Sequence, residues 1–171
     1  MNSLSGDAFA THLAGVFEHT DWIAGATHAS GPFASVDALH EAMMAVVRAA
    51  DEATVLALLR AHPELGGREA RTGAMTAAST GEQGRLGFAG LAKDEQAMLE
   101  DLNARYRDRF GFPCIIALKL HRNRASVFAE HRRRLVRDRA TEIAACLDQI
   151  AVITRGRLDG VVSDARDGRS A

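Results

Sequence analysis

Between residues 62 and 83 the sequence gathers side chains that could transfer a proton and hold a small polar molecule. His62, Pro63 and Glu64 come first, and residues 79–83 (Ser-Thr-Gly-Glu-Gln) follow after a glycine-rich segment. Histidine has an ordinary pKa of about 6.5, so it exchanges protons near neutral pH. Carboxylate, hydroxyl and carboxamide groups nearby could orient such a histidine or bind the amides of a ligand. The stretch therefore suggests acid–base chemistry on a small polar substrate.

The same residues also have a structural explanation. Pro63 disfavours the helical conformation in His62, so a helix should end there, and a histidine in a last helical turn complements the helix dipole. Ser79 lies three residues before Glu82, which is the spacing of a capping box. Gln83 would then be a solvated residue of that helix. On spacing alone, this structural explanation is the more common one for a lone histidine.

The elements that position these residues are predicted to be helices. Aromatic residues make up only 5% of the 171 residues and alanine is abundant, which favours close-packed helices over a β-sandwich. The length and the 47% hydrophobic content suit one buried core. We expect an all-α fold, a single compact bundle of about seven or eight helices over residues 1–162. Residues 163–171 are expected to form a polar, frayed tail.

Apolar residues at helical spacing, together with capping residues, place the individual helices. Met98, Leu99, Leu102 and Tyr106 are expected to face inward from one of them. Residues 66–73 are expected to form a loop, and residues 114–118 a short strand or a buried helical turn. The first expected helix covers residues 7–18 with Asp7 as its cap, a second starts near Asp21, and a third starts at Ser35 or Asp37. A fourth runs from Asp51 to about Ala61, and a fifth starts at Ser79. The last three cover residues 94–108, 126–136 and 141–158.

Four segments, taken in order, resemble a known family. They are His62-Pro63-Glu64-Leu65, Ser79-Thr80-Gly81-Glu82-Gln83, Arg109-Phe110-Gly111-Phe112-Pro113 and Arg155-Gly156-Arg157-Leu158. In this order and spacing, over about residues 7–162, the chain resembles the 2-oxo-4-hydroxy-4-carboxy-5-ureidoimidazoline (OHCU) decarboxylases, which act between urate and (S)-allantoin. Four motifs in order are far more specific than any one of them.

The resemblance implies an all-α homodimer that decarboxylates OHCU without a metal or an organic cofactor. The family's catalytic histidine falls on His62. We expect Glu82 to be catalytic as well, by a hydrogen bond to His62 or to the substrate hydroxyl. The family's substrate-binding arginine in the last helix falls on Arg157, with Arg155 as the alternative. The family mostly has Asp where this chain has Glu64, and Phe where this chain has Cys114. The substrate contacts fall on Pro63, Ser79, Thr80, Gly81, Glu82, Gln83, Cys114, Ile115, Ile116, Ala117, Leu118 and Arg157.

Other functional classes find little support. The formal net charge of −1 argues against nucleic-acid or anionic-membrane binding, and the basic run 131–139 is expected to be a solvated helix face or to form salt bridges across a dimer. His12, His19 and His28 lack the spacing of a metal site. No signal peptide or membrane span is recognised, and two cysteines without CxxC spacing suit the cytoplasm. A helical ligand-binding module, or an enzyme acting on a related ureide, remains an alternative.

Overall fold

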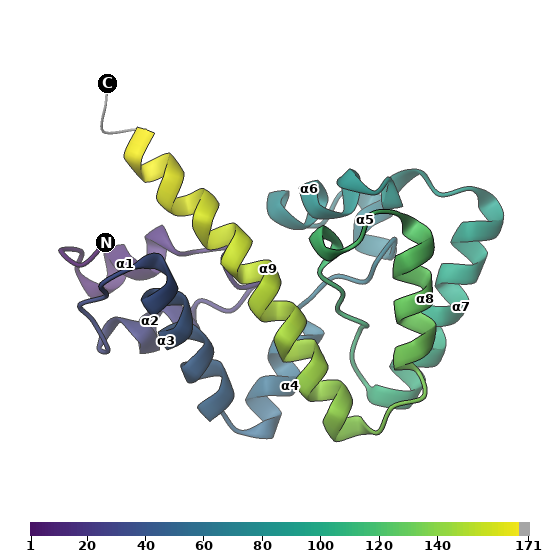
Figure 1. Cartoon of the computed structure of the whole chain (residues 1–171), viewed down its shortest axis with the longest axis horizontal. Coiled ribbons are helices and arrows are strands. Elements are labelled where there is room, and N and C mark those ends of the chain that lie inside the picture. Colours follow the sequence, from purple (N-terminus) through teal and green to yellow (C-terminus); the bar gives the residue numbers. More distant parts are fainter. Residues whose placement is uncertain (168–171) are drawn as a thin grey trace. The chain divides into compact units, whose positions relative to one another are not determined.

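The computed structural model describes residues 1–167, except for the side chains of residues 71, 89 and 164–167. Within this part of the chain all regular secondary structure is helical, so the all-α fold is confirmed (Figure 1). The helices belong to two compact units, one containing residues 1–58 and the segment from 151 onward, and the other containing residues 59–150. No helix in residues 1–167 is both long and apolar enough to cross a lipid bilayer.

The first unit contains the N-terminal helices and the end of the chain. Two of the predicted caps are confirmed, because the Ser35 hydroxyl accepts a hydrogen bond from the Ala38 N–H at 3.0 Å and the Asp51 carboxylate accepts one from the Thr54 N–H at 2.7 Å. The helices of this unit are α1 (Gly6–His12), α2 (Trp22–His28), α3 (Val36–Ala49), most of α4 (Glu52–Arg60) and the C-terminal part of α9 (Arg139–Asp167).

Helix α1 is shorter than predicted, and its cap is Ser5 rather than Asp7. The residues that suggested a helix as far as residue 18, Leu13, Val16 and Phe17, are buried, but they lie in the turns that follow α1. Gly15 in those turns has a φ of 83°, a left-handed conformation that breaks a helix. Apolar side chains that are buried in turns therefore have here the same spacing as the apolar face of a helix.

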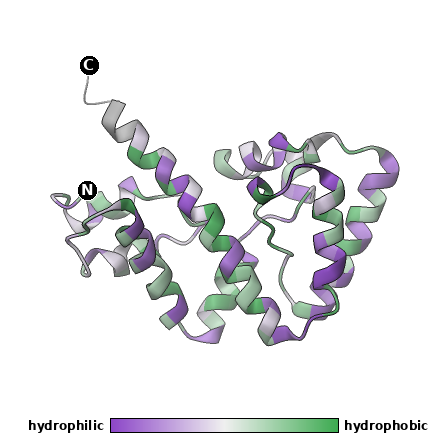
Figure 2. Ribbon diagram, in the orientation of Figure 1, coloured by the Kyte–Doolittle hydropathy of each residue, from purple (hydrophilic) through white to green (hydrophobic). Residues whose placement is uncertain are grey.

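The second unit holds most of the motifs singled out above. Helices α7 and α8 pack against each other, and Figure 2 shows that α8 and α9 both carry hydrophilic and hydrophobic residues. The elements of this unit are α5 (Arg68–Thr72), α6 (Ala77–Arg85), the 3-10 turn η1 (Phe88–Gly90), α7 (Lys93–Phe110), the 3-10 turn η2 (Leu118–Leu120), α8 (Arg124–Arg134) and the first part of α9.

Several local predictions for this unit are wrong. The predicted loop 66–73 contains the short helix α5, and residues 113–117 form neither a strand nor a helix. Helix α6 begins earlier than predicted, because the Thr76 hydroxyl accepts the Ser79 N–H at 3.3 Å and is the cap. Ser79 and Glu82 therefore do not form a capping box. On α7, Leu99, Leu102 and Tyr106 are buried as predicted, but Met98 is 43% exposed.

The predicted helix ends at Leu158, but α9 continues beyond this residue to Asp167. Its side chains Cys146, Ile150 and Leu158 are buried as predicted. The helix thus extends into the segment predicted as a frayed tail, and residues 168–171 of that tail lie outside the described residues.

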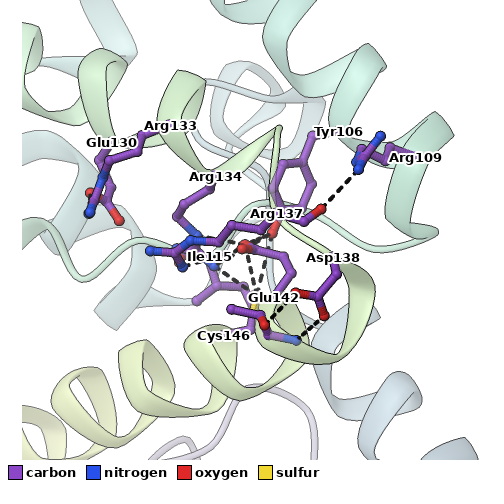
Figure 3. A network of polar contacts seen from close by, with 11 residues as sticks. Tyr106, Arg109, Ile115, Glu130, Arg133, Arg134, Arg137, Asp138, Glu142 and Cys146 are labelled. Carbon is purple, nitrogen blue, oxygen red and sulfur yellow. Dashed lines mark hydrogen bonds and ion pairs between the residues drawn. The ribbon is translucent and has the colours of Figure 1, made fainter.

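The basic segment at the end of α8 is not a uniformly solvated face. Arg133 is exposed and pairs with Glu130, but Arg134 is among the most buried side chains, at 1% exposed (Figure 3). The Arg134 Nε donates to the Glu142 carboxylate at 2.6 Å, and the Tyr106 hydroxyl donates to the same carboxylate. A buried carboxylate on α9 thus draws Arg134 inward, because a guanidinium is buried only when it is paired.

Candidate functional site

His62 follows the end of α4, at the place where the sequence predicts a helix to stop. Its N–H donates to the Leu59 carbonyl at 3.3 Å, and Pro63 then leads the chain away from the helix. The His62 side chain is 6% exposed and lines a pocket of about 500 Å³ within the second unit. A pocket of this volume is large enough for a small metabolite.

Gln83 of α6 joins that helix to the loop after His62. Its Nε2 donates to the Glu64 carbonyl at 3.1 Å, and its Oε1 accepts the Gly66 N–H at 2.9 Å. Because a carbonyl only accepts and an N–H only donates, the two contacts fix which way the carboxamide faces. Gln83, expected to contact substrate, therefore also holds the His62 loop against α6.

Helix α7 holds the same loop from another side. The Asn103 Nδ2 donates to the Leu65 carbonyl at 3.0 Å, and the Gln96 Nε2 donates to the Gly66 carbonyl at 3.3 Å. Together with Gln83, these residues supply one amide donor to each of three consecutive carbonyls of the loop. We call this arrangement, Gln83, Gln96 and Asn103 on carbonyls 64–66, the amide clamp.

Two glycines allow the loop to come this close to its neighbours. Gly66 has a φ of 55°, and a Cβ built there would lie 2.8 Å from the Leu99 Cδ2. A Cβ on Gly67 would lie 2.7 Å from the Glu64 Cβ. Any larger residue at either position would require the neighbouring side chain or the loop itself to shift.

The pocket beside His62 has a strongly mixed charge. Its cationic side chains are those of Arg60, Arg68 and Arg107, and the Arg107 guanidinium forms an ion pair with the Glu64 carboxylate. Such a lining suits a small molecule with an acid group and several amide groups. The described lining residues are Arg60, His62, Glu64, Gly67, Arg68, Glu69, Glu100, Asn103, Arg107, Gly111, Phe112 and Pro113.

Residues 79–83 lie on α6, beside the His62 loop, but they are not among the described lining residues of this pocket. Ser79 is buried, Glu82 is half-buried, and Thr80 and Gly81 are exposed. The Thr80 hydroxyl donates to the Thr76 carbonyl one turn earlier at 2.9 Å. Of this predicted group, Gln83 bonds to the loop through both the oxygen and the nitrogen of its carboxamide.

The segment after Phe112 and Pro113, which both line the pocket, is buried from Cys114 to Leu118. The Arg134 guanidinium donates to the Ile115 carbonyl, and the Ala117 N–H donates to the Gln149 Oε1 at 2.8 Å. The Ala117 N–H, expected to contact substrate, thus has a partner on α9. These contacts hold the segment in an extended conformation without a neighbouring strand.

Arg157 belongs to the first unit. Its Nη1 donates to the Glu18 carboxylate at 2.6 Å, and the Arg157 and Glu18 side chains are 7% and 1% exposed. Arg155, the alternative, forms ion pairs with Asp37 and Asp159, which are both largely exposed. Arg157 is therefore the buried, firmly oriented arginine of the pair.

Sequence reasoning missed Asn103 and His131. Both are buried, and the His131 Nε2 lies 3.1 Å from the Asn103 Oδ1. Burial, reinforced by the nearby Arg134 and Arg132 guanidinium groups, lowers the pKa of His131 to about 4. The only signal in the sequence was an asparagine in the middle of the apolar face of α7. Among the side chains that the structure describes, those of His, Cys, Asp and Glu form no cluster of three or more that could hold a metal ion.

Comparison with known proteins identifies the family. The family model described as OHCU decarboxylase matches residues 2–159 of the chain. The chain belongs to the OHCU decarboxylase family. This membership confirms the resemblance that the four sequence motifs indicated.

Individual members of the OHCU decarboxylase family match over most of the chain. An OHCU decarboxylase of Haloferax volcanii is 37% identical over 92% of this chain and 91% of its own, and one of Mus musculus is 34% identical over 92% and 88%. A crystal structure of an (S)-allantoin synthase superposes with a TM-score of 0.72 at 26% identity. That match covers 94% of this chain and 51% of the other, so this chain spans about half of that protein's length.

Proposed function

We propose that this protein decarboxylates OHCU to (S)-allantoin in urate degradation, with His62 as the proton donor and without a cofactor. The observation that carries the proposal is membership of the OHCU decarboxylase family across residues 2–159. The role of His62 follows from the resemblance of the His62-Pro63-Glu64-Leu65 motif to that family. The structure supports it by placing His62, almost buried, in a loop that α6 and α7 hold through the amide clamp.

The chemistry of OHCU explains why no cofactor is needed. The carboxylate leaves from a ring carbon that bears a hydroxyl group and lies next to a C=N bond. When the C–C bond breaks, its electron pair forms a C=C bond, and the π pair of the imine moves to nitrogen, which takes up a proton. The substrate thus carries its own electron sink, the part that pyridoxal phosphate or thiamine diphosphate supplies elsewhere.

A second proton transfer sets the stereochemistry. The hydroxyl group loses its proton and becomes a carbonyl, while the former imine carbon gains a proton on one face. In our proposal His62 delivers that proton, and Glu82 orients His62 or the substrate hydroxyl. General acid catalysis of this kind typically contributes about 10²–10⁴-fold to the rate.

The remaining site residues would bind and orient the substrate. Ser79 to Gln83 and Pro63 would contact the ureido and ring amides, and the backbone of Cys114 to Leu118 would complete the site. Arg157 would hold a carboxylate or carbonyl oxygen with its planar guanidinium. The burial of Arg157, compared with the exposed ion pairs of Arg155, supports the choice between them.

The proposal extends to assembly and location. We expect the protein to work as a homodimer in the cytoplasm, with OHCU as its small-molecule partner and no nucleic acid or membrane. Two free, buried cysteines are compatible with a reducing compartment.

The activity is tested with OHCU made freshly by oxidation of urate, because OHCU decays by itself to racemic allantoin. The purified protein should accelerate the loss of OHCU and produce a circular dichroism signal of (S)-allantoin. His62→Ala should lower the catalysed rate by about 100-fold or more, whereas His12→Ala, in the first unit, should leave it unchanged.

The outcomes separate the candidate functions. A His62→Ala protein that still gives (S)-allantoin at nearly the wild-type rate would refute the role of His62. A wild-type protein that binds OHCU without turnover would support the ligand-binding module. Turnover of another ureide in preference to OHCU would point to a related enzyme.

A further inference from the structure

A buried chain of hydrogen bonds links α8 to the loop that carries His62. Asn103, at 6% exposed, lies between the Leu65 carbonyl, 3.0 Å from its Nδ2, and His131, 3.1 Å from its Oδ1. His131 is completely buried. Leu65 is three residues after His62, so this chain of hydrogen bonds ends three residues from the proposed proton donor.

The chemistry of the three groups fixes the proton on His131. A backbone carbonyl only accepts, so the Asn103 atom that faces Leu65 must be the NH₂ group. The Oδ1 then faces His131 and only accepts, so the His131 Nε2 must carry a proton. Neutral His131 is therefore the Nε2–H tautomer, donating to Asn103.

The position of His131 is set by its surroundings. Its ring packs edge-on against the Tyr106 ring, with the centroids 5.4 Å apart. Without a donor at this place, the Asn103 Oδ1 would lose its His131 partner, and the carboxamide would be held from one side only, by the Leu65 carbonyl. His131 thus fixes the position from which Asn103 holds the loop.

We propose that His131, through Asn103, is a positioning residue that places the His62 loop for proton transfer. His131 does not contact the substrate in this proposal but acts through Asn103, which lines the pocket, and the kinetic part of it rests on the proposed function. A displacement of a reacting group by about 1 Å is enough to lower a rate by about 10²-fold, so a remote hydrogen bond can have a large kinetic effect.

The kinetic experiment compares two replacements of His131 in the full-length protein. His131→Phe keeps a ring against Tyr106 but has no donor, and we expect kcat to fall by about 10- to 100-fold with KM changed by less than about threefold. His131→Gln restores an N–H donor, and we expect kcat to return to within about threefold of wild type. Val127→Ala, another buried change on α8, serves as the control for lost stability.

The comparison separates positioning from stability. All three variants are expected to lower the melting temperature, but Val127→Ala should keep the wild-type kcat at a temperature where it is folded. If His131→Phe keeps the kcat of Val127→Ala, or if His131→Gln is as slow as His131→Phe, the positioning role is overturned.

A second measurement does not depend on activity. In ¹⁵N-histidine-labelled protein, NMR should show the Nε2–H tautomer for His131, and the ring signals of His62 should shift in His131→Phe and return in His131→Gln. A wild-type protein inactive on OHCU would reject the proposed function but leave this NMR result to decide the coupling. The Nδ1–H tautomer, or unchanged His62 signals in His131→Phe, would overturn the inference.

Discussion

Arg134 and Glu142 form an ion pair that is almost completely removed from water. Their side chains are 1% and 0% exposed, and the Arg134 Nε lies 2.6 Å from the Glu142 Oε1. Tyr106 and Cys146 complete the surroundings of the pair, as Figure 3 shows. Because Arg134 also donates to the Ile115 carbonyl, this pair connects α8, α9 and the extended segment beside the site.

Removing one partner of this pair should be strongly destabilising. Arg134→Met leaves the buried Glu142 carboxylate with the Tyr106 hydroxyl as a donor and with Arg137, at the longer distance of 3.4 Å, as its cation, and we expect a loss of roughly 3–5 kcal/mol in the free energy of unfolding. Arg133→Met, on the exposed pair with Glu130, should cost about 1 kcal/mol or less. Urea unfolding at pH 7 measures both, and equal losses would contradict the buried pairing.

The two cysteines should resist chemical modification in the folded protein. Cys114 and Cys146 are free and buried, and burial raises the pKa of both thiols above the ordinary value. Since the thiolate is the reactive form, iodoacetamide at pH 8 should leave both unmodified under native conditions and label both in denaturant. Mass spectrometry of the two reactions provides the measurement, and rapid native labelling of either cysteine would speak against its burial.

His131 should make the protein less stable in mild acid. Its pKa of about 4 in the folded state is below the ordinary value of about 6.5, so between these pH values the unfolded chain binds a proton that the folded chain does not. Stability is therefore lost as the pH falls through this window. Between pH 7 and pH 5 we expect His131 to account for a loss of about 2 kcal/mol, from about 1.4 kcal/mol per pH unit.

The matched variant for this pH effect is His131→Gln, which has no titrating group. Its free energy of unfolding, measured with urea at pH 7 and pH 5, should fall by less than that of the wild-type protein. An equal fall in the free energy of unfolding for the two proteins would show that the pKa of His131 is not lowered by folding.

Gly66→Ala tests the close approach of the His62 loop to α7. The new methyl group would meet the Leu99 Cδ2 at 2.8 Å on a backbone with positive φ, and we expect a loss of about 2–3 kcal/mol in the free energy of unfolding. Gly73→Ala has a similar positive φ of 71° but no atom within 4 Å, so it should cost only about 1 kcal/mol. Thermal unfolding of both variants isolates the contact with Leu99, and equal losses would argue against it.

The fold class and the family could be predicted from the sequence, because helical spacing and motif order can be read directly along the chain. Ser35, Asp51 and the stop before Pro63 were predictable, since a cap or a proline acts on its own neighbours. The helix predicted as far as residue 18 was wrong beyond His12, because Leu13, Val16 and Phe17 are buried in turns and have the same apolar spacing as a helix.

The supports of the site were beyond the reach of sequence patterns. Arg134 looked like part of a solvated basic run, and only its meeting with Glu142, on another helix, explains its burial. Asn103 and His131 are 28 residues apart, and neither has a periodicity that reports the other. Gln83 was predicted for its motif, but its bonds to the His62 loop depend on a backbone conformation that no local pattern encodes.

The amide clamp has one consequence for how the site responds to its surroundings. Gln83, Gln96 and Asn103 are uncharged, and so are the three carbonyls that they hold. Dissolved ions screen charges but leave hydrogen bonds between neutral groups, such as these buried and half-buried ones, largely unaffected. The frame around His62 should therefore keep its geometry from low to high ionic strength, while the charged lining of the pocket alone responds to salt.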